Sequence, residues 1–317
     1  MFNSESTLEE CLRSIPKNCE LVLVDQYSGD RSVSVARAIR PDAKLIKAGA
    51  NRGFGAGCNL GAANAGGDVL VFLNPDASFL TPESLQIISD TARSTNTLVG
   101  PRILNQSGED QTRARYWSSV QSELGAIFLP GKLVKGAFVR DIPHGNEVYR
   151  TGGPVPYVQG SCMAISAVNF WRVDGFDERL FLYREEETLS LKLLQHGIQS
   201  FLEPRAVITH IGGRSTQQLR NFSAAQYYRS EILFYRSRYS RPVAFTATLM
   251  TWISLTTMAV LTPVRKFTGP RKDIGYPWYR AAAKGVASGW RREVVVPPRV
   301  LIRADGVPAS SHDAFVQ

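Results

Sequence analysis

The first 80 residues alternate between short apolar runs and segments with helical spacing of their apolar residues. The run from Val69 to Leu73 has the length and apolar content of a buried strand. It ends at Asn74-Pro75-Asp76, a turn sequence whose proline restricts the residue before it. The same alternation predicts, in chain order, a helix at 6–15, a strand at 21–24, a helix at 32–39, a strand at 44–47, and a glycine-rich loop entering a helix at 51–61. This β–α–β order predicts an α/β fold with a mostly parallel, doubly wound sheet flanked by helices.

The pattern is less regular after residue 100. Residues 105–155 hold many Gly, Pro and Arg residues, and we interpret them as loops around a cleft. Further on, the sequence predicts extended pieces at 157–165 and 206–210 and a helix at 185–196, which Gly197 ends.

An apolar segment from Val243 to Leu261 follows the last predicted strand. It is long enough to span a bilayer, but its Thr and Ser residues make it only moderately hydrophobic. Arg238 and Arg241 precede it, and Arg265 and Lys266 follow it. Three interpretations stay open: a helix that lies on a membrane surface, a helix packed in a soluble protein, and a true span. We divide the chain into a domain at 1–240 and a helical segment at 241–317.

Charge is distributed unevenly along the 317 residues. Residues 1–200 carry 20 Lys and Arg against 22 Asp and Glu, whereas residues 201–317 carry 17 against 6. A basic C-terminal third favours nucleic acid or an anionic membrane surface as partner. The four cysteines lack paired metal spacing, and no signal peptide is visible, so we expect a cytoplasmic protein.

The Asp76 carboxylate follows directly after the predicted strand at 69–73. Ligands of open α/β sheets bind at the rim where strands end, so this carboxylate is a candidate ligand-binding group. The glycine-rich loop does not match the fingerprint of a dinucleotide-binding loop. Its glycines fail the spacing, because Cys58 and Leu60 stand where the third glycine would be, and the chain has no phosphate-binding G-x-x-x-x-G-K-[ST] element.

Several short motifs occur in a fixed order along the chain. They are Asp25 with Ser28-Gly29-Asp30, the loop from Asn51 to Gly61, Asn74-Pro75-Asp76-Ala77, Gly160-Ser161-Cys162-Met163, Gly175-Phe176-Asp177-Glu178, the run from Phe181 to Glu187, and His210-Ile211-Gly212-Gly213-Arg214-Ser215. As an ordered set, they resemble the inverting glycosyltransferases of family 2, and within them the rhamnosyltransferase-like branch. The resemblance covers roughly residues 3–240 and implies a GT-A fold with a nucleotide-sugar-binding sheet.

The resemblance also implies a metal site and a catalytic base. Asp76 would hold a divalent metal, Mg²⁺ or Mn²⁺, on the donor diphosphate, and His210 would either complete this site or be structural. Glu186 would be the general base that deprotonates the acceptor hydroxyl, with Glu185 as the alternative. Thr188 departs from the family pattern, in which an aspartate usually stands before the following leucine.

Other positions match those that contact the donor in relatives. They are Asn3, Asp25, Asn51, Gly53, Asn59 and Asn74. The resemblance implies transfer of a sugar such as rhamnose, from a donor such as dTDP-rhamnose, to a cell-surface glycan that is often lipid-linked. We therefore expect a peripheral enzyme at the inner face of the cell membrane.

Two alternatives remain from other classes. The first is a non-catalytic relative that has lost activity. The second is a nucleic-acid-binding protein that uses the tyrosines and arginines between Tyr227 and Tyr239. We prefer a helix packed on the catalytic domain for that segment and expect no nucleic-acid partner.

The resemblance breaks down at the start of the sequence. Relatives open with an apolar interior strand, whereas here only Phe2 and Asn3 match the end of that strand. The first strand is therefore expected to be missing, because the start lies downstream of the true one or because the product is degenerate. We expect an open slot in the sheet beside Leu21–Val24.

Overall fold

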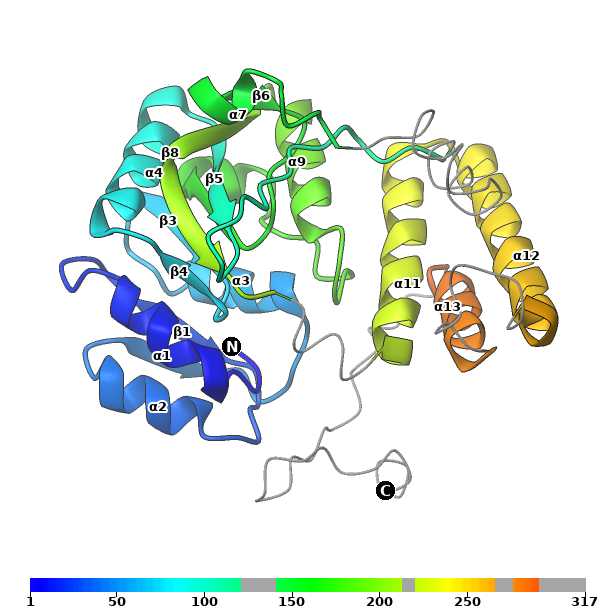
Figure 1. Ribbon diagram of the computed structural model, residues 1–317, viewed down its shortest axis with the longest axis horizontal. Helices are drawn as coiled ribbons and strands as arrows, with labels where there is room; N and C mark the ends of the chain where they lie inside the picture. The colour runs from blue at the N-terminus through cyan, green and yellow to red at the C-terminus, as the bar shows by residue number, and fades with distance from the viewer. Residues whose placement is uncertain (121–140, 213–219, 266–275, 291–317) are drawn as a thin grey trace.

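The computed structural model describes residues 1–120, 141–212, 220–265 and 276–290 (Figure 1). Its strands are β1 (Val22–Asp25), β2 (Lys44–Lys47), β3 (Val69–Leu73), β4 (Ala77–Phe79), β5 (Leu98–Leu104), β6 (Gly153–Val155), β7 (Cys162–Ser166) and β8 (Ser200–His210). Its helices are α1 (Glu5–Ser14), α2 (Ser32–Ile39), α3 (Phe54–Ala62), α4 (Pro82–Thr95), α7 (Val148–Thr151), α8 (Ala167–Arg172), α9 (Glu185–Gln195), α11 (Arg220–Arg238), α12 (Arg241–Arg265) and α13 (Tyr276–Ser288).

The strands form two sheets, and their directions correct one expectation. The smaller sheet pairs β1 with β2, and the larger has the order β3-β7-β5-β8-β4 with β6 beside β8. β1–β2 and β5–β8 are parallel, but β3–β7, β5–β7, β4–β8 and β6–β8 are antiparallel. The prediction of a mostly parallel sheet was wrong, because the strand–helix alternation that imposes parallel crossovers stops after β3.

An aromatic cluster fixes β3 in the larger sheet. Phe72 packs with Phe170 and Phe176 at ring-centroid distances of 5.0 and 5.3 Å. All three rings are buried, and burying a side chain of this size contributes about 1.5–3 kcal/mol. The exit of β3 is therefore held rigidly, which positions the turn at residues 74–76.

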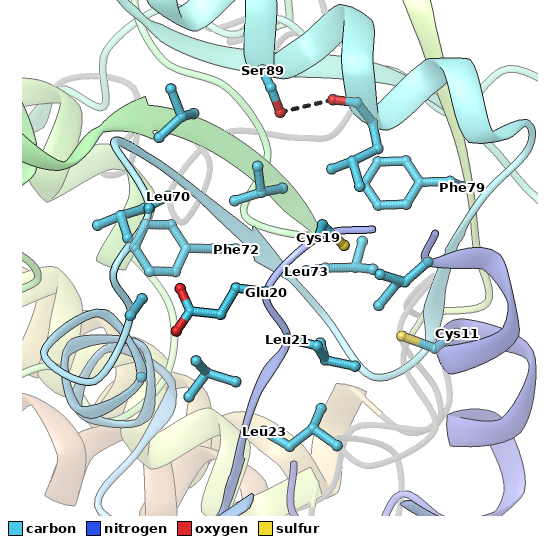
Figure 2. Close-up of a pocket in the computed structure, with 18 of the residues that line it drawn as sticks. Cys11, Cys19, Glu20, Leu21, Leu23, Leu70, Phe72, Leu73, Phe79 and Ser89 are labelled. Atoms are coloured by element: carbon cyan, nitrogen blue, oxygen red, sulfur yellow. Dashed lines mark hydrogen bonds between the residues drawn. The ribbon is translucent and has the colours of Figure 1, made fainter. Parts of the chain in front are cut away.

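A cavity of about 930 Å³ lies between β1 and β3. Figure 2 shows Leu21 and Leu23 on one side of this space and Phe72 of β3 on another. The space is partly open to solvent and is far larger than the small voids of a packed protein interior. The expected open slot beside Leu21–Val24 is confirmed.

The strand edges on both sides of this slot have hydrogen-bonding groups directed into it. The amide of Asn74 donates to Ser161 O, so the alternating peptide groups of Val69 and Val71 point to the opposite edge, where no strand of the described chain pairs. At the other side, the Met1 amine donates to Val24 O at 2.6 Å, and the Gln26 amide donates to Met1 O at 2.9 Å. Burial lowers the pKa of this amine. The slot therefore has the form of a place for one additional strand beside β1.

The helices α11, α12 and α13 pack together at the side of the molecule away from α2 (Figure 1). α11 also contacts the sheet domain, because Ser230 Oγ donates to Leu182 O at 2.8 Å. It thus joins both parts of the chain, and the division at residue 240 stays a prediction. Residues 213–215 of the histidine motif, and Lys266, lie outside the described residues.

The apolar side chains of α12 have an unusual distribution around the helix. Mostly small residues face the other helices, and most large apolar residues face outward. The buried residues include Ala244, Ala247, Thr251, Ser254, Ala259 and the larger Leu255, and the exposed large apolar residues are Val243, Phe245, Leu249, Met250, Trp252, Ile253 and Val260. By length and composition alone, the helix segment Arg241–Val260 is long and apolar enough to cross a membrane. In its most apolar stretch of 18 residues, 39% is buried inside the protein.

The slot leads to a direct test of its geometry. We expect that an engineered apolar extension of about five alternating Val and Ile residues, fused before Met1, raises Tm by about 5 °C or more, because it fills the void and pairs two open strand edges. Amide hydrogen exchange in β1 and β3 should slow at the same time. The matched control is a Gly-Ser extension of equal length. Equal Tm values and equal exchange for the two extensions would contradict this description of the slot.

Candidate active site

The Asp76 carboxylate and the His210 imidazole lie side by side at one edge of the sheet. β4 pairs with β8 in a register that sets Ala77 opposite His210, and the Ile211 amide donates to Asp76 O at 3.0 Å. His210 Nε2 lies 3.3 Å from Asp76 Oδ1, and both side chains are about one quarter exposed. The two residues predicted as metal ligands are thus brought together and remain open to solvent.

Gly160 and Ser161 connect this edge to the predicted base. The Asn74 amide donates to Ser161 O at 2.9 Å. A Cβ placed on Gly160 would lie 3.7 Å from Glu186 Oε2, so the Glu186 carboxylate packs directly against this glycine. The base candidate and the Asn74–Asp76 turn therefore flank the same short segment.

The two predicted catalytic carboxylates begin helix α9 and differ in burial. Glu185 is 3% exposed, whereas Glu186 is half-buried. Burial and the neighbouring Glu186 raise the pKa of Glu185 well above its ordinary value. Burial also raises the pKa of Glu186, as does Glu187, while Arg184 lowers it. A raised pKa makes a carboxylate a better proton acceptor, so Glu186 combines basicity with access.

Two residues with left-handed backbone conformations precede these carboxylates. Tyr183 has φ 72° and Arg184 has φ 71°. Each such non-glycine residue costs about 1–3 kcal/mol, so surrounding contacts must hold this turn in place. The Arg184 guanidinium donates to Glu187 Oε2 at 2.6 Å and also to Ser118 Oγ and Glu231 Oε2. These buried ion pairs fix the start of α9.

The glycine-rich loop lies against the segment that precedes α9. The Gly53 amide donates to Asn51 Oδ1 at 3.0 Å, and the Phe54 amide donates to Phe181 O at 3.2 Å. Gly53 has φ 98°, and a Cβ there would meet Phe181 O at 2.3 Å, so only glycine fits. The predicted donor-binding loop and the base-bearing helix are thereby positioned relative to each other.

The structure gives the side chain of Asn59 internal partners. Its Nδ2 donates to Phe176 O at 3.0 Å and to Glu178 Oε1 at 3.1 Å, and its Oδ1 accepts from the Phe176 amide at 2.9 Å. This amide holds the Gly175–Glu178 turn against α3. The donor contact predicted for Asn59 stays a prediction.

Asn3 and Asp25 meet at the loop after β1. Asn3 Oδ1 accepts from the Gly29 amide at 2.8 Å, and Asp25 Oδ1 accepts from the Ser28 amide at 3.2 Å. Asp25 is buried at 5% exposure. The two side chains order the same loop, and their predicted role in binding the nucleotide is untested by this geometry.

Ser161, Ser118 and Arg184 were given no role from the sequence, whereas Asn74 was expected to contact the donor. Ser161 and Asn74 are neighbours, and Ser161 Oγ and Asn74 Oδ1 are buried polar atoms without a hydrogen-bond partner among the described residues. Arg184 forms the buried ion pairs at α9, and Ser118 is hydrogen-bonded within the same cluster. Ser161 belongs to a motif noticed in the sequence, but an arginine in an acidic helix start gives no signal of burial.

The residues at the sheet edge suit a divalent metal. A carboxylate oxygen and an imidazole nitrogen 3.3 Å apart are ligands that Mn²⁺ accepts, and Mg²⁺ accepts the carboxylate. No group of three His, Cys, Asp or Glu side chains able to hold a metal occurs in the described parts of the chain. A metal held by two side chains would leave positions for phosphate oxygens and water, which fits a metal bound together with a diphosphate.

The fold is that of GT-A glycosyltransferases. The sequence profile of the family described as "Glycosyl transferase family 2" matches residues 1–173, and the chain belongs to this family.

Three comparisons illustrate the relationship. The chain is 27% identical over 237 residues to N-acetylglucosaminyl-diphospho-decaprenol L-rhamnosyltransferase of Mycobacterium tuberculosis. This match covers 69% of this chain and 75% of the relative. It is 25% identical over 270 residues to a low-salt glycan biosynthesis hexosyltransferase of Haloferax volcanii, in a match that covers 82% of this chain and 79% of the relative. In fold, the chain is similar to the mannosyltransferase PcManGT from Pyrobaculum calidifontis in complex with GDP-Man and Mn²⁺, with a TM-score of 0.54 and 14% sequence identity. The similarity covers 92% of this chain and 86% of the mannosyltransferase chain.

The burial of Glu185 predicts an unusual pH dependence of stability. Because folding raises the pKa of Glu185, its contribution to stability is complete below the ordinary glutamate pKa of about 4.3 and is lost as the pH rises through the raised value. Glu185→Gln should therefore match the wild type near pH 4 and exceed its unfolding free energy by about 1 kcal/mol at pH 8. Chemical denaturation across this range is the measurement, with the exposed Glu10→Gln as control. A Glu185→Gln protein less stable than wild type at pH 8 would refute the burial argument.

Proposed function

We propose that this protein is a metal-dependent inverting glycosyltransferase that moves a sugar from a nucleotide-sugar donor to a glycan acceptor. The observation that carries the proposal is the pairing of Asp76 with His210 at the edge where Glu186 packs against Gly160. A metal-ligand pair and a basic carboxylate at one sheet edge are the two elements that an inverting displacement needs.

Asp76 and His210 are the residues that hold the metal in this proposal. When bound, the divalent metal neutralises the nucleoside diphosphate as it leaves. Asn74 and Ser161 carry the buried polar atoms Oδ1 and Oγ beside this turn. The donor contact expected of Asn74 is part of this proposal. Mn²⁺ in the similarly folded mannosyltransferase supports the choice of a divalent metal.

Glu186 takes the proton from the acceptor hydroxyl as that oxygen attacks the anomeric carbon. Its raised pKa favours the transfer, and Glu186 is less buried than Glu185. A single displacement inverts the anomeric centre. Glu185 is the second candidate, but its burial at 3% exposure opposes direct contact with an acceptor.

The names of the relatives support the proposed substrates. The Mycobacterium tuberculosis relative is named as a rhamnosyltransferase acting on a diphospho-decaprenol carrier. We infer that the donor is a nucleotide sugar such as dTDP-rhamnose and that the acceptor is a glycan on a lipid carrier, in the assembly of a cell-wall or surface polysaccharide. The second relative, a hexosyltransferase, makes other hexoses the first alternatives to test.

A lipid-linked acceptor requires access to a membrane, and α12 offers a suitable surface. Its outward residues include Phe245 and Trp252, which are 58% and 43% exposed. Arg241 begins the helix, and the C-terminal third of the chain is strongly basic. Large apolar side chains beside basic ones are typical of helices that lie at an anionic membrane surface. We infer a peripheral position at the cytoplasmic face of the membrane.

The structure removes two residues from the surface on which the nucleic-acid alternative depends. Arg229 and Tyr235 are 2% and 0% exposed, so these two side chains of α11 pack inside the helical cluster. The non-catalytic alternative is decided by turnover, which the next experiment measures.

Two substitutions separate donor binding from transfer. Asp76→Asn should weaken Mn²⁺-dependent binding of the nucleotide sugar by about tenfold or more, because the described site contains no second carboxylate beside His210. Glu186→Gln should leave donor binding unchanged and lower kcat by about 10²–10⁴, because a base acts only on the acceptor. Donor binding is measured by calorimetry and transfer by product formation from dTDP-rhamnose, and product NMR reports the anomeric configuration. A wild-type protein that binds donors without turning them over would establish the non-catalytic alternative.

The membrane surface is tested on α12. Phe245→Asp and Trp252→Asp should each weaken binding to phosphatidylglycerol–phosphatidylcholine vesicles by about tenfold or more, because a buried aromatic side chain contributes about 1.5–3 kcal/mol. Vesicle sedimentation is the measurement, and Val168→Asp, which changes an exposed residue of α8, is the control. Added salt should weaken binding, since the Debye length is about 8 Å at physiological ionic strength. Wild-type protein that stays in the supernatant with these vesicles would refute the membrane proposal.

A further inference from the structure

One buried charge cluster joins α11 to the start of α9. Arg184 donates to Glu187 Oε2 at 2.6 Å, and its other terminal nitrogen donates to Glu231 Oε2 on α11. The side chains of all three residues are at most 5% exposed. Ser118 lies in the same cluster, because Glu187 accepts from its amide and its hydroxyl at 2.6 Å each.

α11 holds the turn that precedes α9 at a second point. Ser230 Oγ, next in sequence to Glu231, donates to Leu182 O at 2.8 Å. Arg184 also lies over the rings of Tyr227 and Phe234, at 5.5 and 5.7 Å from their centroids. α11 therefore contacts the residues at both ends of the left-handed pair Tyr183–Arg184, immediately before the carboxylates.

We propose that Arg184 is a positioning residue, which anchors the turn carrying Glu186 to Glu231 of α11 and so makes the helical cluster part of the catalytic site. Glu186 itself touches Gly160, while Arg184 acts through the backbone of the turn. The expected effect on kcat rests on the proposed function. The anchoring of the turn by α11 does not depend on that function.

The charged groups around Glu186 set its pKa, and a change in this pKa distinguishes the proposal from a simple loss of stability. Burial, Glu185 and Glu187 oppose ionisation of Glu186, whereas Arg184 and Arg115 favour it. Glu231 balances part of the Arg184 charge. Removing Arg184 should raise the pKa of Glu186, and removing the Glu231 charge should lower it.

The test compares four variants of the full chain. Arg184→Met should shift the acid limb of the kcat profile to higher pH by on the order of one unit, and Glu231→Gln should shift it to lower pH. Arg184→Lys keeps the charge and should leave the limb near its wild-type position, although it loses the forked geometry. Arg40→Met is the matched control, because Arg40 is another buried arginine, paired with Asp42 at the end of α2. It should lower Tm without moving the limb.

Hydrogen exchange gives a readout that does not depend on activity. Arg184→Met and Glu231→Gln should each accelerate amide exchange at 182–188 by about tenfold or more, with little change in β3. Unchanged exchange at 182–188 in both variants would overturn the anchoring. Acid limbs that move in the same direction, or not at all, would overturn the effect on the base. Faster exchange in a protein without turnover would support the anchoring and refute the proposed function instead.

Discussion

The pairing of β4 with β8 is the contact on which the candidate site depends. It sets Ala77 opposite His210, so Asp76 lies beside a histidine that is far from it in the sequence. The turn between β3 and β4 cannot move freely, because β7 pairs with β3 from Val69 to Leu73. Three strand segments from distant parts of the chain therefore fix the two metal-ligand candidates before any donor binds, and such preorganisation is a main source of catalytic power.

The two halves of the site have opposite environments. Asp76 and His210 are partly open to solvent, which suits groups that exchange metal and diphosphate. The start of α9 is buried, and the pKa values of Glu185 and Glu186 are raised there chiefly by burial. One half of the candidate site can therefore stabilise negative charge on a leaving group while the other half accepts a proton. Separation of these roles by environment is a recurrent way to obtain acid–base chemistry near neutral pH.

Local patterns in the sequence predicted the local elements well. The strand at Val69–Leu73 and the helix at Ser32–Ile39 have the bounds expected from apolar spacing and turn residues. Strand direction was predicted wrongly after β3, because pairings such as β3–β7 join segments about 90 residues apart, and no local pattern encodes them. The pairing of Asp76 with His210 was inferred from the family resemblance, because these two residues are also far apart in the sequence. Arg184 was missed, since burial of a charged side chain depends on α11, which packs on it from a distant part of the chain.

The central claim is that Asp76 and His210 hold a divalent metal together with the donor diphosphate. Pulsed electron paramagnetic resonance of Mn²⁺ bound to the full chain with dTDP tests it most directly. The account predicts one imidazole nitrogen coupling and phosphorus couplings in the same complex, with the nitrogen coupling lost in His210→Gln and the phosphorus couplings kept. A Mn²⁺–dTDP complex of the protein without a nitrogen coupling, or one that His210→Gln leaves unchanged, would contradict it.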